Sequence, residues 1–263
     1  MKFDQCASSS PKVSIQAQSK VRILVSGEDA LIVEYGDGID PVINDHVYGL
    51  ADAIDAFGND SILELIPTYR SLLVHYDSQV SSPNEMIEFL GALITETNDS
   101  SDGTENTLRR VYELPVVYGG AYGQDLEDVA NHAGMTPADV IAIHSGSDYR
   151  VYMLGFAPGF PYLGGMDDRI AIPRLTTPRV RVPAGSVGIA GSQTGVYPKA
   201  SPGGWRLIGN TPVSLFNPEV NPPVPFLPGS FIRFNPITEE DAERVSEQVT
   251  SGEYKVKMIE LKS

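Results

Sequence analysis

Residues 155–212 form the part of the sequence that is most informative about chemistry. Three arginines stand close together in this glycine- and proline-rich stretch, Arg174, Arg179 and Arg181, although the whole protein has a formal net charge of −15. A guanidinium group binds a carboxylate, a phosphate or a carboxybiotin-like anion through paired hydrogen bonds. The same arginines could instead balance nearby acids such as Asp167 and Asp168, and the sequence leaves both interpretations open.

Further polar and aromatic residues accompany the arginines. Gln193, Thr194 and Tyr197 lie among glycines, where an amide and two hydroxyls suit a small polar ligand, although turn chemistry alone also selects such residues. Trp205 could contact a ligand or fill a hydrophobic core. His144 ends an expected helix, and a helix C-terminus favours the imidazolium form. It is therefore a candidate acid or anion-binding group, with a structural cap as the alternative.

Several classes of site are excluded by what the sequence lacks. It has no G-x-x-x-x-G-K-[ST], H-E-x-x-H, C-x-x-C or G-x-S-x-G motif, and its four histidines are scattered. We therefore expect no metal site. The stretch GGAYGQD at 119–125 looks like a phosphate-binding loop, but Asp125, Glu127 and Asp128 would repel a phosphate. We read it as a glycine turn, with Asp125 capping the helix that follows.

Composition narrows the function further. The acidic balance argues against non-specific binding to nucleic acids or to anionic membranes. A single cysteine, Cys6, permits no intrachain disulfide, which fits a reducing cytosol, and we expect a cytoplasmic protein. No apolar run approaches the ~20 residues of a membrane span, and the N-terminus does not read as a secretory signal.

The first half of the chain predicts a small α+β domain. Residues 1–20 read as a disordered tail. Between 21 and 96 the apolar pattern gives two strands, a helix ending at Gly58, two more strands and a helix starting near Ser82. This order predicts one sheet with helices on one face. The polar stretch 97–108 is the expected linker.

The second half, residues 109–263, predicts a β-barrel or sandwich. A strand and two short helices come first, and short strands divided by glycine and proline follow. A helix beginning near Thr238 and a strand at 254–261 close the chain. These elements would bring residues 155–212 together on one barrel.

The sequence LGFAPGFPYLGG, together with TPRVRVPAGSVGIAGSQTGVYPKASPGGWRLIGNTP, closely resembles the family that comprises KipI, allophanate hydrolase subunit 1 and the B subunit of 5-oxoprolinase. The stretches IPTYRSLLVHYD and LPVVYGGAYGQDLEDVA share this resemblance, which covers about residues 21–250. It implies a small α+β domain followed by a cyclophilin-like β-barrel. It also implies two partners in a complex that uses ATP, namely a homologous cyclophilin-like C subunit and a LamB/YcsF-type A subunit.

The resemblance leads to a function and to roles for the residues. We expect one component of an ATP-dependent 5-oxoprolinase, inactive alone, that opens 5-oxoproline to glutamate. The expected catalytic residues are His144, Arg174 and Arg179. The expected substrate-binding residues are Tyr162, Gln193, Tyr197 and Trp205. The expected contacts with the partner barrel are Phe156, Phe160 and Leu163, whose alternative role is a small core under their loop.

Two other functions stay open at the level of sequence. A member of this family resembles an inhibitor of a sensor histidine kinase, which would act by docking rather than catalysis. The paired barrels also resemble the carboxyltransferase part of urea carboxylase, although this chain lacks the fused biotin carboxylase and biotinyl regions. It could serve that chemistry only together with other chains.

Overall fold

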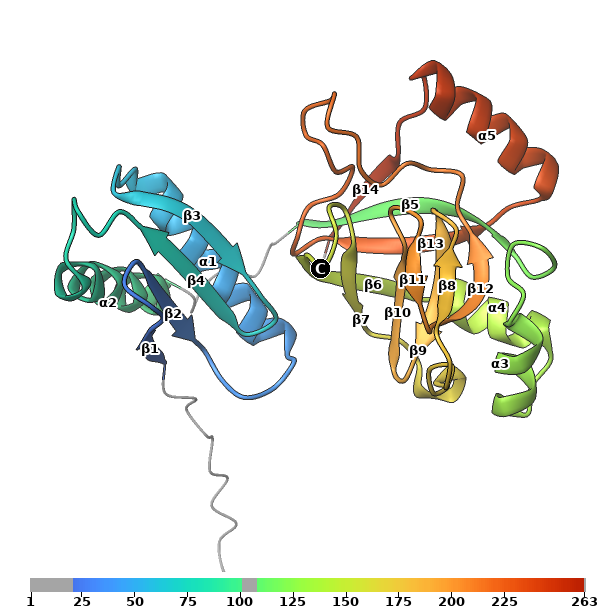
Figure 1. Cartoon of the computed structure of the whole chain (residues 1–263), viewed down its shortest axis with the longest axis horizontal. Coiled ribbons are helices and arrows are strands. Elements are labelled where there is room, and N and C mark those ends of the chain that lie inside the picture. The colour runs from blue at the N-terminus through green and yellow to red at the C-terminus, as the bar shows by residue number, and fades with distance from the viewer. Residues whose placement is uncertain (1–20, 101–107, 263) are drawn as a thin grey trace, which may run out of the picture.

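The computed structural model describes residues 21–100 and 108–262. The expected tail, including Cys6, and most of the expected linker lie outside the described residues. Within them the chain forms two large hydrophobic cores, each built on its own sheet, and a small third core of Val182, Tyr197 and Leu207 with Trp205 packed against it. Figure 1 shows the two sheets. We refer to residues 21–100 as the N-terminal unit and to residues 108–262 as the barrel.

Four antiparallel strands form the sheet of the N-terminal unit, in the spatial order β1-β2-β4-β3. The elements are β1 (Arg22–Val25), β2 (Ala30–Glu34), α1 (Pro41–Phe57), β3 (Ile62–Pro67), β4 (Ser71–Tyr76) and α2 (Pro83–Ser100). Alternate residues of the central strand β4 are buried, and they join both helices in one core. The predicted order of strands and helices is confirmed.

Local sequence explains where the two helices begin and end. The Asp40 side chain accepts hydrogen bonds from the backbone nitrogens of the first turn of α1, and Gly58 ends that helix in the left-handed conformation at φ 70°. Ser82 and Glu85 form reciprocal capping bonds at the start of α2. Helix α2 continues to Ser100, so the first four residues of the expected linker are helical.

The barrel is an eight-stranded sheet in the order β10-β9-β12-β5-β13-β6-β7, with β14 also paired to β5. Strands β10 and β7, at the two ends of this order, contact each other and nearly close the sheet. Its strands are β5 (Leu108–Tyr118), β6 (Asp148–Leu154), β7 (Pro161–Gly164), β9 (Ser186–Ala190), β10 (Gln193–Val196), β12 (Arg206–Asn210), β13 (Phe231–Pro236) and β14 (Lys257–Lys262). The α+β fold class with a barrel-like second part is thus confirmed.

Short elements surround this sheet (Figure 1). They are α3 (Leu126–Ala133), α4 (Pro137–Ser145), the 3-10 helix η2 (Asp168–Ile170), the paired strands β8 (Arg179–Val182) and β11 (Ser201–Gly203), and α5 (Glu239–Ser251). Strand β8 carries Arg179 and Arg181. Strand β11 ends two residues before Trp205. Within the described residues, no helix has both the length and the apolar content required to cross a membrane.

Candidate functional site

An aromatic cluster on the barrel brings together residues far apart in the chain. The Phe160 ring lies edge-on to three others, with centroid distances of 5.3 Å to Tyr162, 6.0 Å to Tyr197 and 6.0 Å to Trp205. Tyr197 and Trp205 also meet edge-on at 6.2 Å. Edge-to-face packing of this kind fixes ring orientation as well as burying apolar area. Three of the predicted substrate-binding residues therefore share one cluster.

Two glycines make room for the cluster. A Cβ atom on Gly195 of β10 would lie 3.1 Å from the Trp205 ring. A Cβ atom on Gly203 of β11 would lie 2.4 Å from the Tyr197 hydroxyl oxygen, closer than such contacts allow. The glycines of this stretch are therefore needed for close approach of rings to backbone, and not only for turns.

Arg174 is an exposed cation beside the aromatic cluster. Its side chain is exposed, and its guanidinium carbon lies 5.8 Å from the centroid of the Trp205 ring. Across the ranges that the structure describes, Arg174 forms no ion pair with a carboxylate. A guanidinium that lies beside an aromatic ring and has no carboxylate partner is suited to binding an anionic ligand.

Arg179 has a different role. Its Nη2 donates a hydrogen bond of 2.7 Å to the Asp125 carboxylate, and its Nη1 donates one of 3.3 Å to the Trp205 carbonyl. Asp125 is 5% exposed and also accepts a 2.6 Å bond from the backbone nitrogen of Leu207. The Arg179 charge is therefore already compensated by a buried carboxylate, which makes it a support for the Trp205 backbone.

Asp125 corrects a prediction made from the sequence. It stands at the N-cap position of α3, as expected, but its side chain makes no capping hydrogen bond. Its carboxylate points instead to Arg179 and the strand β12. The suggested acid partners of the arginines are also different, because Asp167 pairs with Arg169, whose hydrogen bonds lower the Asp167 pKa to about 2. Arg181 is exposed.

His144 is buried inside the barrel and is not a surface cation. Its ring nitrogens share hydrogen bonds of 2.8 Å with the Tyr118 hydroxyl and 2.8 Å with the Thr194 hydroxyl. Its ring stacks on Phe234 at 4.7 Å, and the residue is 0% exposed. Burial lowers the His144 pKa to about 3. The prediction that His144 is a charged imidazolium is therefore wrong. The cost of burying the charged ring exceeds the stabilisation that the C-terminus of the short helix α4 would give it.

Gln193 meets a residue from the N-terminal unit. Its Nε2 donates a 3.2 Å hydrogen bond to the hydroxyl of Tyr69, whose ring lies 6.0 Å from Tyr162. Burial raises the pKa of Tyr69 to about 12, so its hydroxyl stays protonated. Sequence reasoning did not single out Tyr69. The sequence signal for Tyr69 was its place in IPTYRSLLVHYD, one of the stretches that carry the family resemblance. Its contact with Gln193 could not be predicted, because residue spacing does not show which distant segments pair.

The three predicted interface residues separate into two groups. Phe160 and Leu163 face the interior at 4% and 3% exposure, so they serve packing in this structure. Phe156 is 74% exposed and adopts φ 61°, a left-handed conformation that is strained for a phenylalanine. It lines an open depression of about 370 Å³ together with Phe216 and Val224. Only Phe156 therefore remains a candidate for contact with a partner.

The described residues offer no obvious metal centre. Within the ranges 21–100 and 108–262, no three histidine, cysteine, aspartate or glutamate side chains gather in a way that could hold a metal ion. What they offer instead is a cation, an amide and several aromatic faces. Groups of these kinds are suited to contacts with a small anionic molecule that has a flat body.

Comparisons with known proteins find relatives over most of the chain. The model of the family described as carboxyltransferase domain, subdomain C and D, matches residues 21–226. The chain is 43% identical over 235 residues to the B subunit of 5-oxoprolinase from Bacillus subtilis (strain 168), covering 84% of this chain and 95% of that protein. It is 40% identical over 220 residues to the B subunit of 5-oxoprolinase from Escherichia coli O157:H7, covering 84% and 98%.

A solved structure shares the fold over most of the chain. The crystal structure of TTHA0988 in space group P212121 superposes with a TM-score of 0.70 at 34% identity. The match covers 83% of this chain and 40% of that chain. The same arrangement therefore occurs there as part of a longer polypeptide.

Proposed function

Because the chain belongs to the family of carboxyltransferase domains, subdomains C and D, we propose that it is the B subunit of an ATP-dependent 5-oxoprolinase. Two relatives that are named as this component of 5-oxoprolinase match it over 95% and 98% of their lengths. The observation in the structure that carries the proposal is Arg174. It is an exposed cation without a counter-ion among the described residues, beside the ring of Trp205.

The chemistry of 5-oxoproline matches this site. The molecule has one carboxylate and one cyclic amide on a flat five-membered ring. Arg174 would bind the carboxylate, and the partly exposed rings of Trp205 and Tyr162 would contact the substrate ring, with buried Tyr197 packed behind Trp205. Gln193 would hydrogen-bond the amide. Arg179, held by Asp125, would support the position of Trp205.

The reaction needs activation of a stable amide before water can attack. Transfer of the γ-phosphoryl group from ATP to the amide oxygen releases ADP and makes the ring carbon electrophilic. Water then adds to that carbon, and the C–N bond breaks as the nitrogen takes up a proton, which leaves an acyl phosphate. A second water hydrolyses this acyl phosphate to glutamate and phosphate. In this proposal the present chain binds and orients the substrate, and a cation near the developing negative charge lowers the barrier.

We assign the remaining tasks to partner subunits. A homologous cyclophilin-like C subunit and a LamB/YcsF-type A subunit would complete the enzyme, and ATP would bind in the complex, not necessarily on this chain. We therefore expect the isolated chain to be inactive. The complex would work in the cytoplasm, which fits a chain with one cysteine.

The proposal is tested by measuring ADP release that depends on 5-oxoproline. The chain is assayed alone and mixed with the two partner subunits. Turnover only in the full mixture supports the proposal. Arg174→Gln should then raise the KM for 5-oxoproline at least tenfold, since it removes a charged hydrogen-bond donor.

A matched variant shows whether any loss is specific. Arg244→Gln removes an exposed guanidinium on α5 that pairs with Glu240 and Asp241, away from the aromatic cluster. Its turnover should equal that of the wild type. An assembled mixture without activity would contradict the proposal and favour carboxyl transfer or kinase inhibition.

A further inference from the structure

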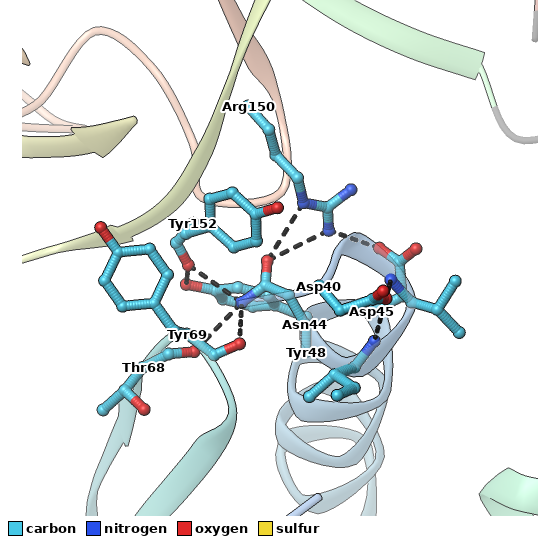
Figure 2. A network of polar contacts seen from close by, with 10 residues as sticks. Asp40, Asn44, Asp45, Tyr48, Thr68, Tyr69, Arg150 and Tyr152 are labelled. Carbon is cyan, nitrogen blue, oxygen red and sulfur yellow. Dashed lines mark hydrogen bonds and ion pairs between the residues drawn. The ribbon is translucent and has the colours of Figure 1, made fainter. Parts of the chain in front are cut away.

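The N-terminal unit and the barrel are joined by a buried polar junction centred on Asn44 of α1. Asn44 is 0% exposed. Its Nδ2 lies within hydrogen-bond distance of three backbone carbonyl oxygens, at 3.0 Å from Thr68, 3.4 Å from Tyr69 and 3.2 Å from Tyr152 (Figure 2). Two of these carbonyls belong to the turn between β3 and β4, and the third belongs to β6 of the barrel. One side chain therefore ties a turn of the first unit to a strand of the second.

Other groups complete this junction from both sides. The Asn44 Oδ1 accepts bonds of 3.2 Å and 3.1 Å from Nε and Nη2 of Arg150, which also pairs with Asp45. The Tyr48 hydroxyl donates a 3.0 Å bond to the Tyr152 carbonyl. Both polar atoms of the Asn44 amide are thus satisfied away from water. A fully satisfied buried network of this kind favours one arrangement over alternatives.

The junction determines where Tyr69 lies. The turn that carries Tyr69 is closed by a 2.8 Å bond from the Thr68 nitrogen to the Ser71 carbonyl and by contact between their hydroxyls. The Tyr69 ring packs 5.1 Å from the Tyr152 ring and points toward the barrel. A short stiff turn held by Asn44 leaves this ring little freedom.

Tyr69 in turn orients Gln193. The Gln193 side chain is half-buried, and its Nε2 donates to the Tyr69 hydroxyl at 3.2 Å. That bond directs the opposite end of the amide, Oε1, away from Tyr69. Among the described residues Oε1 accepts no hydrogen bond, so it is free to accept an N–H from a ligand.

We propose that the N-terminal unit completes the substrate site, with Tyr69 as a positioning residue that fixes Gln193 to accept the N–H of a cyclic amide. This inference rests on the proposed function and extends it. It assigns the amide end of the substrate to Gln193, while Arg174 takes the carboxylate. It also gives the small unit a role beyond packing, which is to hold Tyr69 against the barrel through Asn44.

The kinetic test uses the reconstituted complex. Tyr69→Phe keeps the ring and removes the hydroxyl, so KM for 5-oxoproline should rise about fivefold to tenfold with kcat within twofold. In a Gln193→Ala background the same change should have no further effect, because the residue it orients is gone. Tyr254→Phe, a half-buried tyrosine elsewhere on the barrel, is the matched control and should leave KM unchanged. An unchanged KM in Tyr69→Phe, with wild-type turnover intact, would overturn the inference but leave the proposed function standing.

A second measurement does not depend on turnover. In the isolated full chain, the side-chain amide signals of Gln193 in a ¹H–¹⁵N NMR spectrum should shift and exchange faster with solvent in Tyr69→Phe. Asn44→Ala should give the same change by releasing the turn, and Tyr254→Phe should not. Signals that match the wild type in both variants would refute the positioning role, even if 5-oxoproline proved not to be the substrate.

Discussion

The buried carboxylate of Asp125 and the guanidinium of Arg179 form a 2.7 Å ion pair between the start of α3 and strand β8. The second Asp125 oxygen accepts a 2.6 Å bond from the Leu207 nitrogen. Asp125 thus links the start of α3 with strands β8 and β12. Arg179 also donates a hydrogen bond to the Trp205 carbonyl, so the same ion pair supports the backbone of Trp205.

Loss of the Asp125 charge should destabilise the barrel. Asp125→Asn leaves the partly buried Arg179 without its counter-ion, and we expect the free energy of unfolding to fall by about 2–3 kcal/mol. Urea denaturation measures this change. Asp128→Asn on the same helix is the control, since Asp128 is largely exposed and should cost under about 0.5 kcal/mol. Equal effects of the two substitutions would show that the buried pair is unimportant.

His144 should make the protein less stable in mild acid. Its pKa is about 3 in the folded protein and about 6.5 when unfolded, so between these values only the unfolded state binds the proton. The contribution is fully present above pH 6.5 and is lost as the pH falls toward 3, at up to about 1.4 kcal/mol per pH unit.

This pH effect can be isolated by substitution. His144→Gln removes the titration, so the fall in unfolding free energy between about pH 7.5 and 5 should be about 2 kcal/mol smaller than in the wild type. Urea denaturation at the two pH values gives the comparison. A wild-type protein that became more stable on acidification would support the imidazolium that the sequence suggested.

A side chain at Gly203 should destabilise the protein, whereas a methyl group at the neighbouring Gly204 should be tolerated. The Cβ of Gly203→Ala would lie 2.4 Å from the hydroxyl oxygen of Tyr197, which is only 3% exposed and cannot move aside. We expect a loss of about 1–3 kcal/mol in unfolding free energy and a shift in the emission of Trp205, the only tryptophan. In Gly204→Ala the nearest atom is 3.6 Å away, an ordinary contact. If both variants keep the wild-type emission, the cluster is looser than described.

Phe156 should matter for assembly and not for folding. Phe156→Gly relieves the positive φ of 61°, so the free energy of unfolding should stay the same or rise by up to about 1 kcal/mol. Affinity for the partner barrel should fall at least tenfold, as for a buried aromatic anchor. Titration calorimetry measures binding, with Val80→Ser on the other unit as the control for an exposed apolar residue. Unchanged affinity would place the interface elsewhere.

Much of the fold could be predicted because its signals are local. The period of apolar residues and the caps at Gly58, Ser82 and Thr238 depend only on neighbours along the chain, and the structure has these helix ends where expected. The end of α2 was placed too early, because its last turn consists of polar residues that also suit a loop.

The sequence by itself determined the residue types of the site, and the tertiary structure decided what each one does. The stretch 155–212 could be identified as the chemical part because its arginines, glycines and rings are close along the chain. The partners of Arg179 and Gln193 lie 54 and 124 residues away, and only the packing of whole elements brings them near. The charge of His144 likewise depends on burial, which is a property of the folded barrel and not of the helix that carries it.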